Sequence, residues 1–195
     1  MTNIKPKIIK GIRNVTISGR IGTGKTTLAD HLGKALGWSV LDGGKIFRKL
    51  ANDMDHHIKN TNQRPDDFDI AYEERIKKLL KEEDNHIVQS HLAGFDAQGI
   101  AGVYKILVIC RNNKGKDKTS IRIDRLMNRD NISINEAKEE VIEREIQNLE
   151  KFRRLYAGND PDWVYWDEKY YDLIVNTYSL NQIEALKFVL KNLGI

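Results

Sequence analysis

The sequence predicts an α/β protein in which helices flank a parallel β-sheet. Short apolar runs alternate along the chain with segments of helical periodicity, the pattern of strand–helix–strand units. A glycine-rich segment follows the first apolar run directly and opens the first helical segment. There is no internal repeat and no linker rich in proline or serine, so residues 1–195 are expected to form a single domain.

Five apolar runs are the expected strands. Each is only a few residues long and ends at polar or turn-forming residues, as strands of a buried sheet do. They are Asn14–Ser18, Ser39–Leu41, His86–Gln89, Lys105–Cys110 and Leu173–Asn176. Because helical segments separate them, we expect the five strands to run parallel within one sheet.

Six segments carry the periodicity of amphipathic helices. They are Lys25–Leu36, Gly44–Asp55, Asp67–Glu83, Ser120–Asp130, Asn135–Tyr156 and Asn181–Leu193. Residues 112–160, between the fourth and fifth strands, are highly charged and offer little apolar surface of their own. An insertion of that kind is typical of a lid that closes over a site, rather than of a second domain.

Composition limits the classes of protein that fit. The chain has a net charge of +4, a pI near 9.0 and a mean hydropathy of -0.54. It has no apolar run of membrane-spanning length, no signal-peptide pattern and a single cysteine, Cys110. We therefore expect a cytoplasmic monomer that binds neither membrane nor nucleic acid, since arginines gathered around a phosphate site would explain the small basic excess.

The glycine-rich segment matches the pattern G-x-x-x-x-G-K-[ST]. It consists of Gly19, Arg20, Ile21, Gly22, Thr23, Gly24, Lys25 and Thr26, followed by Thr27. Glycines let backbone N–H groups approach phosphate oxygens, and the helix N-terminus adds donors. Lys25 would reach the β- and γ-phosphates of ATP, the Thr26 hydroxyl would bind Mg²⁺, and Thr27 would support the α-phosphate. A chance glycine-rich turn is disfavoured because motif, strand and helix are all in register.

Asp42 and Arg48 are candidates for the acceptor side. Asp42 ends the second strand, and the carboxyl ends of parallel strands line the ligand crevice. It could orient an acceptor or Mg²⁺-bound water, or simply cap the next helix. Arg48 could clamp an acceptor phosphate with two hydrogen bonds, or lie on the helix surface.

Three arginines of the insertion are spaced to share one helix face. Arg122, Arg125 and Arg129 lie three and four residues apart. Such a face could stabilise charge on a transferring phosphoryl group. It could equally be a solvated face with Asp124 and Asp130 as partners.

The chain resembles the archaeal-type cytidylate kinases, a P-loop family of nucleoside monophosphate kinases. The phosphate loop is followed, in the family's order, by LDGGKIFRKLA, HIVQSHLAG, KILVIC, the arginine-studded insertion and YYDLIVNT. The resemblance implies the P-loop kinase fold, with a monophosphate-binding segment at about 44–83 and a lid at about 112–160. It also implies transfer of the ATP γ-phosphate to CMP or dCMP with Mg²⁺.

The resemblance assigns roles to particular residues. Arg48 matches the arginine that holds the CMP phosphate, and Asp42 matches the acidic residue at the end of the second strand. Arg122 begins the lid run R-x-x-R-x-x-x-R, and Arg144 matches a later arginine that contacts the phosphates. Asp69 resembles an acidic position that could accept a hydrogen bond from cytosine. Together with Lys25 of the loop, Asp42, Arg122 and Arg144 form the expected catalytic set.

The chain departs from the family at three positions expected to bind substrate. His91 stands where the family usually has an arginine for the acceptor phosphate. Asn148 and Lys151 replace an acidic residue and an arginine, and lysine lacks the planar two-point grip of arginine. Two alternatives follow: a kinase for another nucleotide or a small alcohol, and an ATP-binding protein with a degenerate acceptor site.

Overall fold

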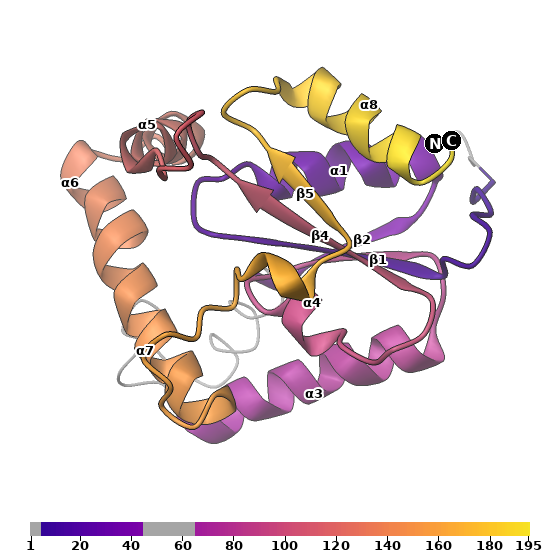
Figure 1. Ribbon diagram of the computed structural model, residues 1–195, viewed down its shortest axis with the longest axis horizontal. Helices are drawn as coiled ribbons and strands as arrows, with labels where there is room; N and C mark the ends of the chain where they lie inside the picture. The colour runs from indigo at the N-terminus through magenta and orange to yellow at the C-terminus, as the bar shows by residue number, and fades with distance from the viewer. Residues whose placement is uncertain (1–4, 45–64) are drawn as a thin grey trace.

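The structure is a computed structural model that describes residues 5–44 and 65–195. Its centre is a five-stranded sheet of order β2-β3-β1-β4-β5, in which every neighbouring pair is parallel (Figure 1). The strands are β1 (Asn14–Gly19), β2 (Ser39–Asp42), β3 (His86–Gln89), β4 (Val103–Ile109) and β5 (Leu173–Asn176). The expected five-stranded parallel sheet is confirmed.

The register brings three functional segments to one edge of the sheet. Asp42, the last residue of β2, is opposite Gln89, the last residue of β3. On its other side β3 pairs with β1, where Ile17 is opposite Gln89. The chain therefore leaves β2, β3 and β1 at neighbouring points along this edge, so that segments far apart in sequence meet there.

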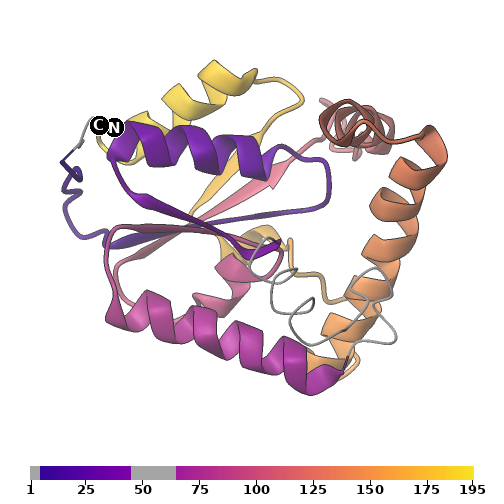
Figure 2. The ribbon, with the colours of Figure 1, turned by 180° about the vertical axis from the view of Figure 1, so that it is seen from behind.

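Helices cover both faces of the sheet (Figures 1 and 2). On one face, α1 (Lys25–Leu36) and α8 (Gln182–Asn192) pack on β-strand residues such as Ile87. On the other, α3 (Asp66–Glu82) and the short α4 (Ala93–Asp96) pack on the next residue, Val88. Successive residues of a strand point to opposite faces, so these apolar strands are buried on both sides, as a parallel sheet requires.

The insertion between β4 and β5 forms an arm along one side of the molecule (Figure 1). It contains α5 (Thr119–Asp130), α6 (Ile134–Lys138), a π-helical turn (Glu139–Glu143), α7 (Arg144–Tyr156) and a 3₁₀ turn (Glu168–Tyr170). The single helix expected from Asn135 to Tyr156 is thus interrupted by a π turn. A small apolar cluster joins α5 and α6 to the phosphate loop; its buried members are Ile21, Ile123, Leu126, Ala137 and Val141.

Other differences from the sequence-based expectations are small. The four-residue helix α4 was not expected, because it is too short to show a helical period. Apart from Gly44, the expected helix Gly44–Asp55, with Arg48, lies outside the described residues. No helix in the described part of the chain is long and apolar enough to cross a membrane.

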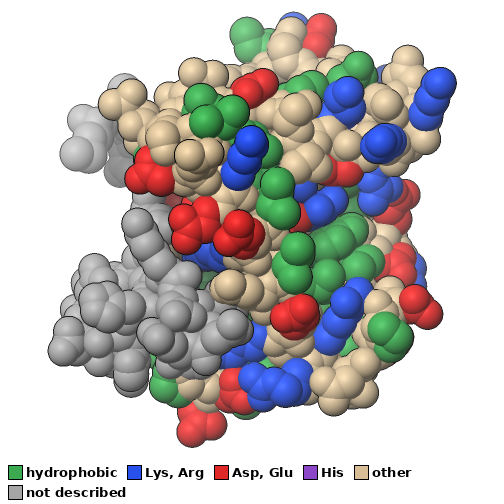
Figure 3. Space-filling model, turned by 90° about the vertical axis from the view of Figure 1, so that its left-hand side faces the viewer, with side chains coloured by type: hydrophobic (Ala, Val, Ile, Leu, Met, Phe, Trp, Pro, Cys, Tyr) green, Lys and Arg blue, Asp and Glu red, His purple; other side chains and the backbone are tan. Residues whose placement is uncertain are grey.

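The side of the molecule on which the arm lies carries mixed charge. Figure 3 shows Lys and Arg side chains interspersed with Asp and Glu side chains on its described part, around a patch of hydrophobic side chains. This pattern is unlike the basic stripe that tracks a nucleic-acid backbone.

Gly43 is the tightest packing constraint at the edge of the sheet where β2 ends. A Cβ atom there would lie 2.8 Å from the carbonyl oxygen of Gln89 and 2.8 Å from the Cβ of Ser90, and it would also collide with the Tyr72 hydroxyl. Because a backbone atom cannot move aside cheaply, we predict that Gly43→Ala lowers the free energy of unfolding by about 1–3 kcal/mol. Urea unfolding measures this loss.

Ser39→Ala, at the exposed start of the same strand, is the matched control and should change stability by less than about 0.5 kcal/mol. Equal unfolding midpoints for Gly43→Ala and the unchanged protein would contradict the described packing.

Candidate functional site

The phosphate loop joins the end of β1 to the start of α1. Gly22 and Gly24 have φ angles of 76° and 96°, in the left-handed region that favours glycine. Helix α1 has no side-chain cap at Gly24 and no acidic residue in its first turn. Its first N–H groups therefore remain available to an anion, and the helix dipole favours negative charge there.

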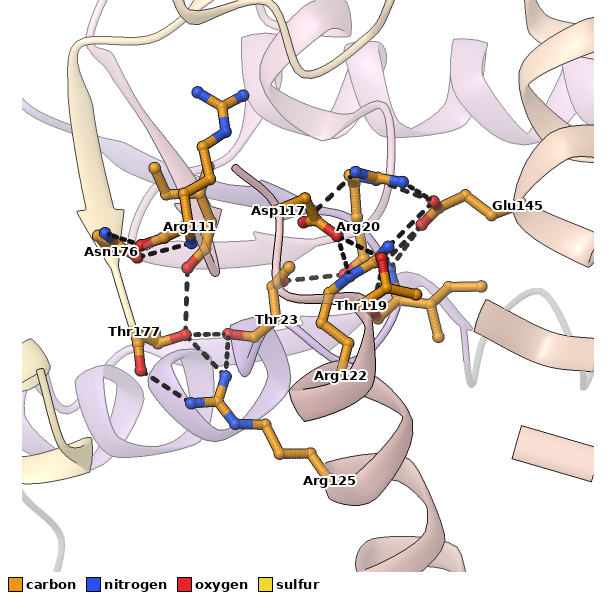
Figure 4. A network of polar contacts seen from close by, with 12 residues as sticks. Arg20, Thr23, Arg111, Asp117, Thr119, Arg122, Arg125, Glu145, Asn176 and Thr177 are labelled. Carbon is orange, nitrogen blue, oxygen red and sulfur yellow. Dashed lines mark hydrogen bonds and ion pairs between the residues drawn. The ribbon is translucent and has the colours of Figure 1, made fainter. Parts of the chain in front are cut away.

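Hydrogen bonds from Thr177, just after β5, and from Arg125 of α5 hold the phosphate loop in place. The Thr23 hydroxyl donates to the Arg20 carbonyl over 2.9 Å, and the Thr177 hydroxyl, just after β5, lies 2.7 Å from the Thr23 carbonyl. Arg125 of α5 donates to both the hydroxyl and the carbonyl of Thr177, each over 2.8 Å. These contacts hold the loop between β5 and the arm (Figure 4).

Lys25 is half-buried beside the loop, and its Nζ donates to the Arg20 carbonyl over 3.4 Å. Its pKa is lowered to about 8, chiefly by desolvation and also by the positive charges of Arg129 and Arg144. Glu145 and Asp42 act in the opposite direction. The expected catalytic residues Lys25, Asp42 and Arg144 therefore lie within electrostatic range of one another.

The three arginines of the expected lid do not share one environment. Arg122 is fully buried, and its Nη1 donates to the Ile21 carbonyl over 2.8 Å and to Glu145 Oε2 over 2.9 Å. Arg125 is bound to Thr177, whereas Arg129 is 57% exposed and paired with Asp130. Residues spaced three and four apart in sequence thus have three separate environments, and Arg122 is packed against the phosphate loop rather than facing open space.

Arg144 lies at the start of α7. Its Nη1 donates to Glu140 over 2.5 Å. Its Nε is buried and has no hydrogen-bond partner among the described residues. A buried donor without a partner is costly, so this N–H is a candidate to bind a phosphate oxygen.

Glu145 is the main residue that the sequence reasoning missed. Its carboxylate accepts hydrogen bonds from Arg20 Nε over 2.8 Å and from Arg122 (Figure 4). The Ile21 N–H also points to this carboxylate, from 3.4 Å. One signal was present: Glu145 lies four residues after buried Val141 and seven before buried Phe152, so a carboxylate occupies the apolar stripe of this helix.

His91, which is expected to bind the acceptor, is turned toward the phosphate loop. Its Nδ1 lies 3.2 Å from the Gly19 carbonyl oxygen and 3.2 Å from the Tyr165 hydroxyl. A hydrogen bond to the Gly19 carbonyl requires the proton on Nδ1, because a carbonyl oxygen can only accept, whereas a hydrogen bond from the Tyr165 hydroxyl requires Nδ1 to be unprotonated. His91, one of the positions at which the chain departs from the family, thus contacts Gly19, the first glycine of the loop.

Asp69 and Lys151, both expected to bind substrate, are bound to each other. Lys151 Nζ lies 2.7 Å from Asp69 Oδ2, and the two side chains are 5% and 4% exposed. Asn148, on the same helix as Lys151, is also buried. Beside this pair, Arg154 forms an exposed ion pair with Asp66. The ion pairs therefore join α7 to α3.

Thr26, the expected Mg²⁺ ligand, lies in the first turn of α1 and is partly exposed. The described residues contain no group of three or more His, Cys, Asp or Glu side chains that could hold a metal ion by themselves. A Mg²⁺ ion here would have to be held jointly by the Thr26 hydroxyl and nucleotide phosphates, an arrangement that Mg²⁺ commonly takes.

Comparison with known proteins agrees with this geometry. A family model described as an AAA domain matches residues 15–147. A cytidylate kinase from Thermoplasma volcanium is 32% identical over 182 residues, which cover 92% of this chain and 90% of that protein. A cytidylate kinase from Saccharolobus islandicus is 29% identical over 184 residues, which cover 93% of this chain and 90% of that protein.

Solved structures share the fold. A shikimate kinase from Bacteroides thetaiotaomicron superposes with a TM-score of 0.59 at 13% identity, covering 94% of this chain and 99% of that one. A gluconokinase from Sinorhizobium meliloti 1021 superposes with a TM-score of 0.56, also at 13% identity, covering 96% of this chain and 94% of that one.

The sheet order, the phosphate loop and these neighbours define a protein of the P-loop kinase fold. Within that class, the chain belongs to the archaeal-type cytidylate kinase family of nucleoside monophosphate kinases.

The lowered pKa of Lys25 leads to a pH prediction. The ammonium of the free protein loses its proton as pH rises through about 8, and it can then no longer balance phosphate charge. We predict that kcat/KM for ATP falls on the alkaline side with a midpoint near 8, because kcat/KM reports groups of the free enzyme. A rate profile from pH 6 to 10 measures it.

Lys25→Arg, which stays charged, should lack this fall, and a flat profile for the unchanged protein would contradict the assignment.

The buried Asp69–Lys151 pair leads to a stability prediction. Lys151→Met leaves the Asp69 carboxylate buried without its ammonium, which typically costs about 3–5 kcal/mol. Replacing both, as Asp69→Asn with Lys151→Met, should cost less than Lys151→Met alone. Arg154→Gln, which breaks the neighbouring exposed pair, should have a much smaller effect. Thermal unfolding of the four proteins tests this, and equal losses for Lys151→Met and Arg154→Gln would be inconsistent with a buried pair.

Proposed function

We propose that this protein transfers the γ-phosphate of ATP to a nucleoside monophosphate, with CMP or dCMP as the preferred acceptor. Its membership of the cytidylate kinase family supports the reaction class. The alignments with the two named relatives span nine-tenths of each relative's length. The comparison therefore includes both the proposed donor segment and the proposed acceptor segment.

One observation supports this proposal most directly: the donor cradle and the acceptor candidates meet at one edge of the sheet. Asp42 ends β2, His91 follows β3 and Gly19 ends β1, and these strands are adjacent. His91 contacts the Gly19 carbonyl, and the Asp42 charge acts on Lys25. Phosphoryl transfer depends chiefly on positioning and charge stabilisation, and this arrangement offers both without a protein nucleophile.

On the donor side, the loop backbone and the first turn of α1 would bind the phosphates of ATP, with Lys25 at the β- and γ-phosphates. Thr26 would hold Mg²⁺, which when bound neutralises charge between those phosphates. Arg144 would offer its buried Nε to a phosphate oxygen. The glycine φ angles and the uncapped helix start fit such a ligand.

On the acceptor side, Asp42 would orient the monophosphate and Arg48, outside the described residues, would bind its phosphate. Asp69, His91, Asn148 and Lys151 would shape the acceptor pocket. In this proposal the chain works as a single monomeric domain, with the acceptor segment at about 44–83 and the lid at about 112–160 excluding water.

A second candidate is phosphorylation of another nucleotide or a small alcohol. Two positions favour it. His91, where an arginine is usual, faces Gly19 and Tyr165. Lys151 is paired with Asp69. Neither side chain is therefore placed as an arginine that binds an acceptor phosphate with two hydrogen bonds would be.

An acceptor panel distinguishes the candidates. The purified chain with Mg²⁺ and ATP is offered CMP, dCMP, UMP, AMP, cytidine and shikimate, and both ADP and the phosphorylated product are measured by chromatography. We predict the highest kcat/KM with CMP or dCMP, and loss of all turnover in Lys25→Ala with an unchanged circular dichroism spectrum.

Each other outcome selects an alternative. Turnover restricted to a phosphate-free alcohol would replace the proposal with a small-molecule kinase. ATP binding by calorimetry without any product would indicate a nucleotide-binding protein with a degenerate acceptor site.

A further inference from the structure

Glu145 is buried at the junction between the arm and the phosphate loop. Its side chain is 6% exposed and contacts charged groups from two segments: Arg20 of the loop and Arg122 of α5. The Ile21 N–H also points to its carboxylate, from 3.4 Å. One carboxylate of α7 thus holds both the loop and α5.

The network around Glu145 is charge-balanced. Asp117, in the turn before α5, lies 3.3 Å from Arg20 Nη1 and 3.1 Å from Arg122 Nε. Two guanidinium groups therefore face two carboxylates. Buried arginines keep their charge, so removing either carboxylate leaves an excess of positive charge at the loop.

The loop and the arm fit together closely at this network. A Cβ atom at Gly22 would overlap the carbonyl oxygen and Cβ of Arg122, so the loop backbone touches α5. The Ile21 side chain packs into the apolar cluster of the arm. A shift of Arg122 is therefore transmitted directly to the part of the loop that precedes Lys25.

The π turn Glu139–Glu143 ends immediately before Arg144 and Glu145. A π turn adds a residue to the helical turn and so changes the direction of the side chains that follow. Arg144, the phosphate-binding candidate, and Glu145, the anchor of the loop, are therefore presented together by one local distortion of the helix.

We propose that Glu145 is a positioning residue for phosphoryl transfer: it fixes Arg20 and Arg122, and through them sets the loop and the arm in the arrangement that reacts. Glu145 acts through the two arginines and does not touch the nucleotide. This inference rests on the proposed kinase function and adds a residue to it.

The charge change at this position has two separable effects. Glu145→Gln keeps the shape of the side chain but removes the negative charge that holds both arginines. The freed positive charge still attracts ATP, so ground-state binding is retained, whereas the reacting geometry is lost. The expected result is a kcat lower by about 10- to 100-fold with a Kd for ATP that is unchanged or lower.

The test measures kcat with the best acceptor and Kd for ATP by calorimetry in four proteins: the unchanged chain, Glu145→Gln, Glu145→Asp and Glu143→Gln. Glu145→Asp keeps the charge and should recover part of kcat. Glu143→Gln makes the same charge change at an exposed position two residues earlier and should match the unchanged chain. Glu145→Asp also serves if Glu145→Gln does not fold.

Two results would overturn the proposal. One is a kcat for Glu145→Gln within twofold of the unchanged chain. The other is a parallel loss of kcat and ATP binding that Glu145→Asp does not recover, which would indicate a purely structural role. An unchanged chain that transfers phosphate to no acceptor would instead overturn the proposed function itself, so the two failures are distinguishable.

Discussion

Two arginine side chains at the phosphate loop, Arg20 and Arg122, require carboxylates beside them. This requirement determines how the segments around the loop pack. Arg122 has no exposed surface, so its charge is stable there only because Glu145 and Asp117 accept its hydrogen bonds. Arg20 of the loop shares both carboxylates. These ion pairs therefore place α5 and α7 against the loop that is proposed to hold ATP.

The same helix carries a second connection at its other end. Six residues after Glu145, Lys151 pairs with Asp69 of α3, with both side chains almost fully buried. Helix α7 thus links the phosphate loop to α3, which belongs to the proposed acceptor segment (Figure 1). Because a rigid helix transmits displacement along its length, occupation of one side should influence the other, which is the behaviour expected of a kinase that must exclude water before transfer.

The sheet and the phosphate loop could be predicted from sequence because their signals are local. Apolar runs define the strands, and the glycine–lysine spacing defines the loop. The surroundings of Arg122, Lys151 and Asp69 could not be predicted in this way. Ile21 and Glu145, which bind Arg122, lie 101 and 23 residues from it, and Lys151 and Asp69 lie on different helices. The arginine spacing alone indicates one shared face, whereas in the structure Arg122, Arg125 and Arg129 differ in burial and bind different partners. The roles assigned to the site residues remain predictions.

The most direct test of the account follows the phosphoryl group itself. In a single turnover with excess protein, Mg²⁺ and ATP labelled in the γ-phosphate, the label is separated into nucleoside diphosphate and inorganic phosphate, with and without CMP. The account predicts that label moves to CDP only when CMP is present, with little inorganic phosphate in either case. Release of label as inorganic phosphate at the same rate with and without CMP would contradict it.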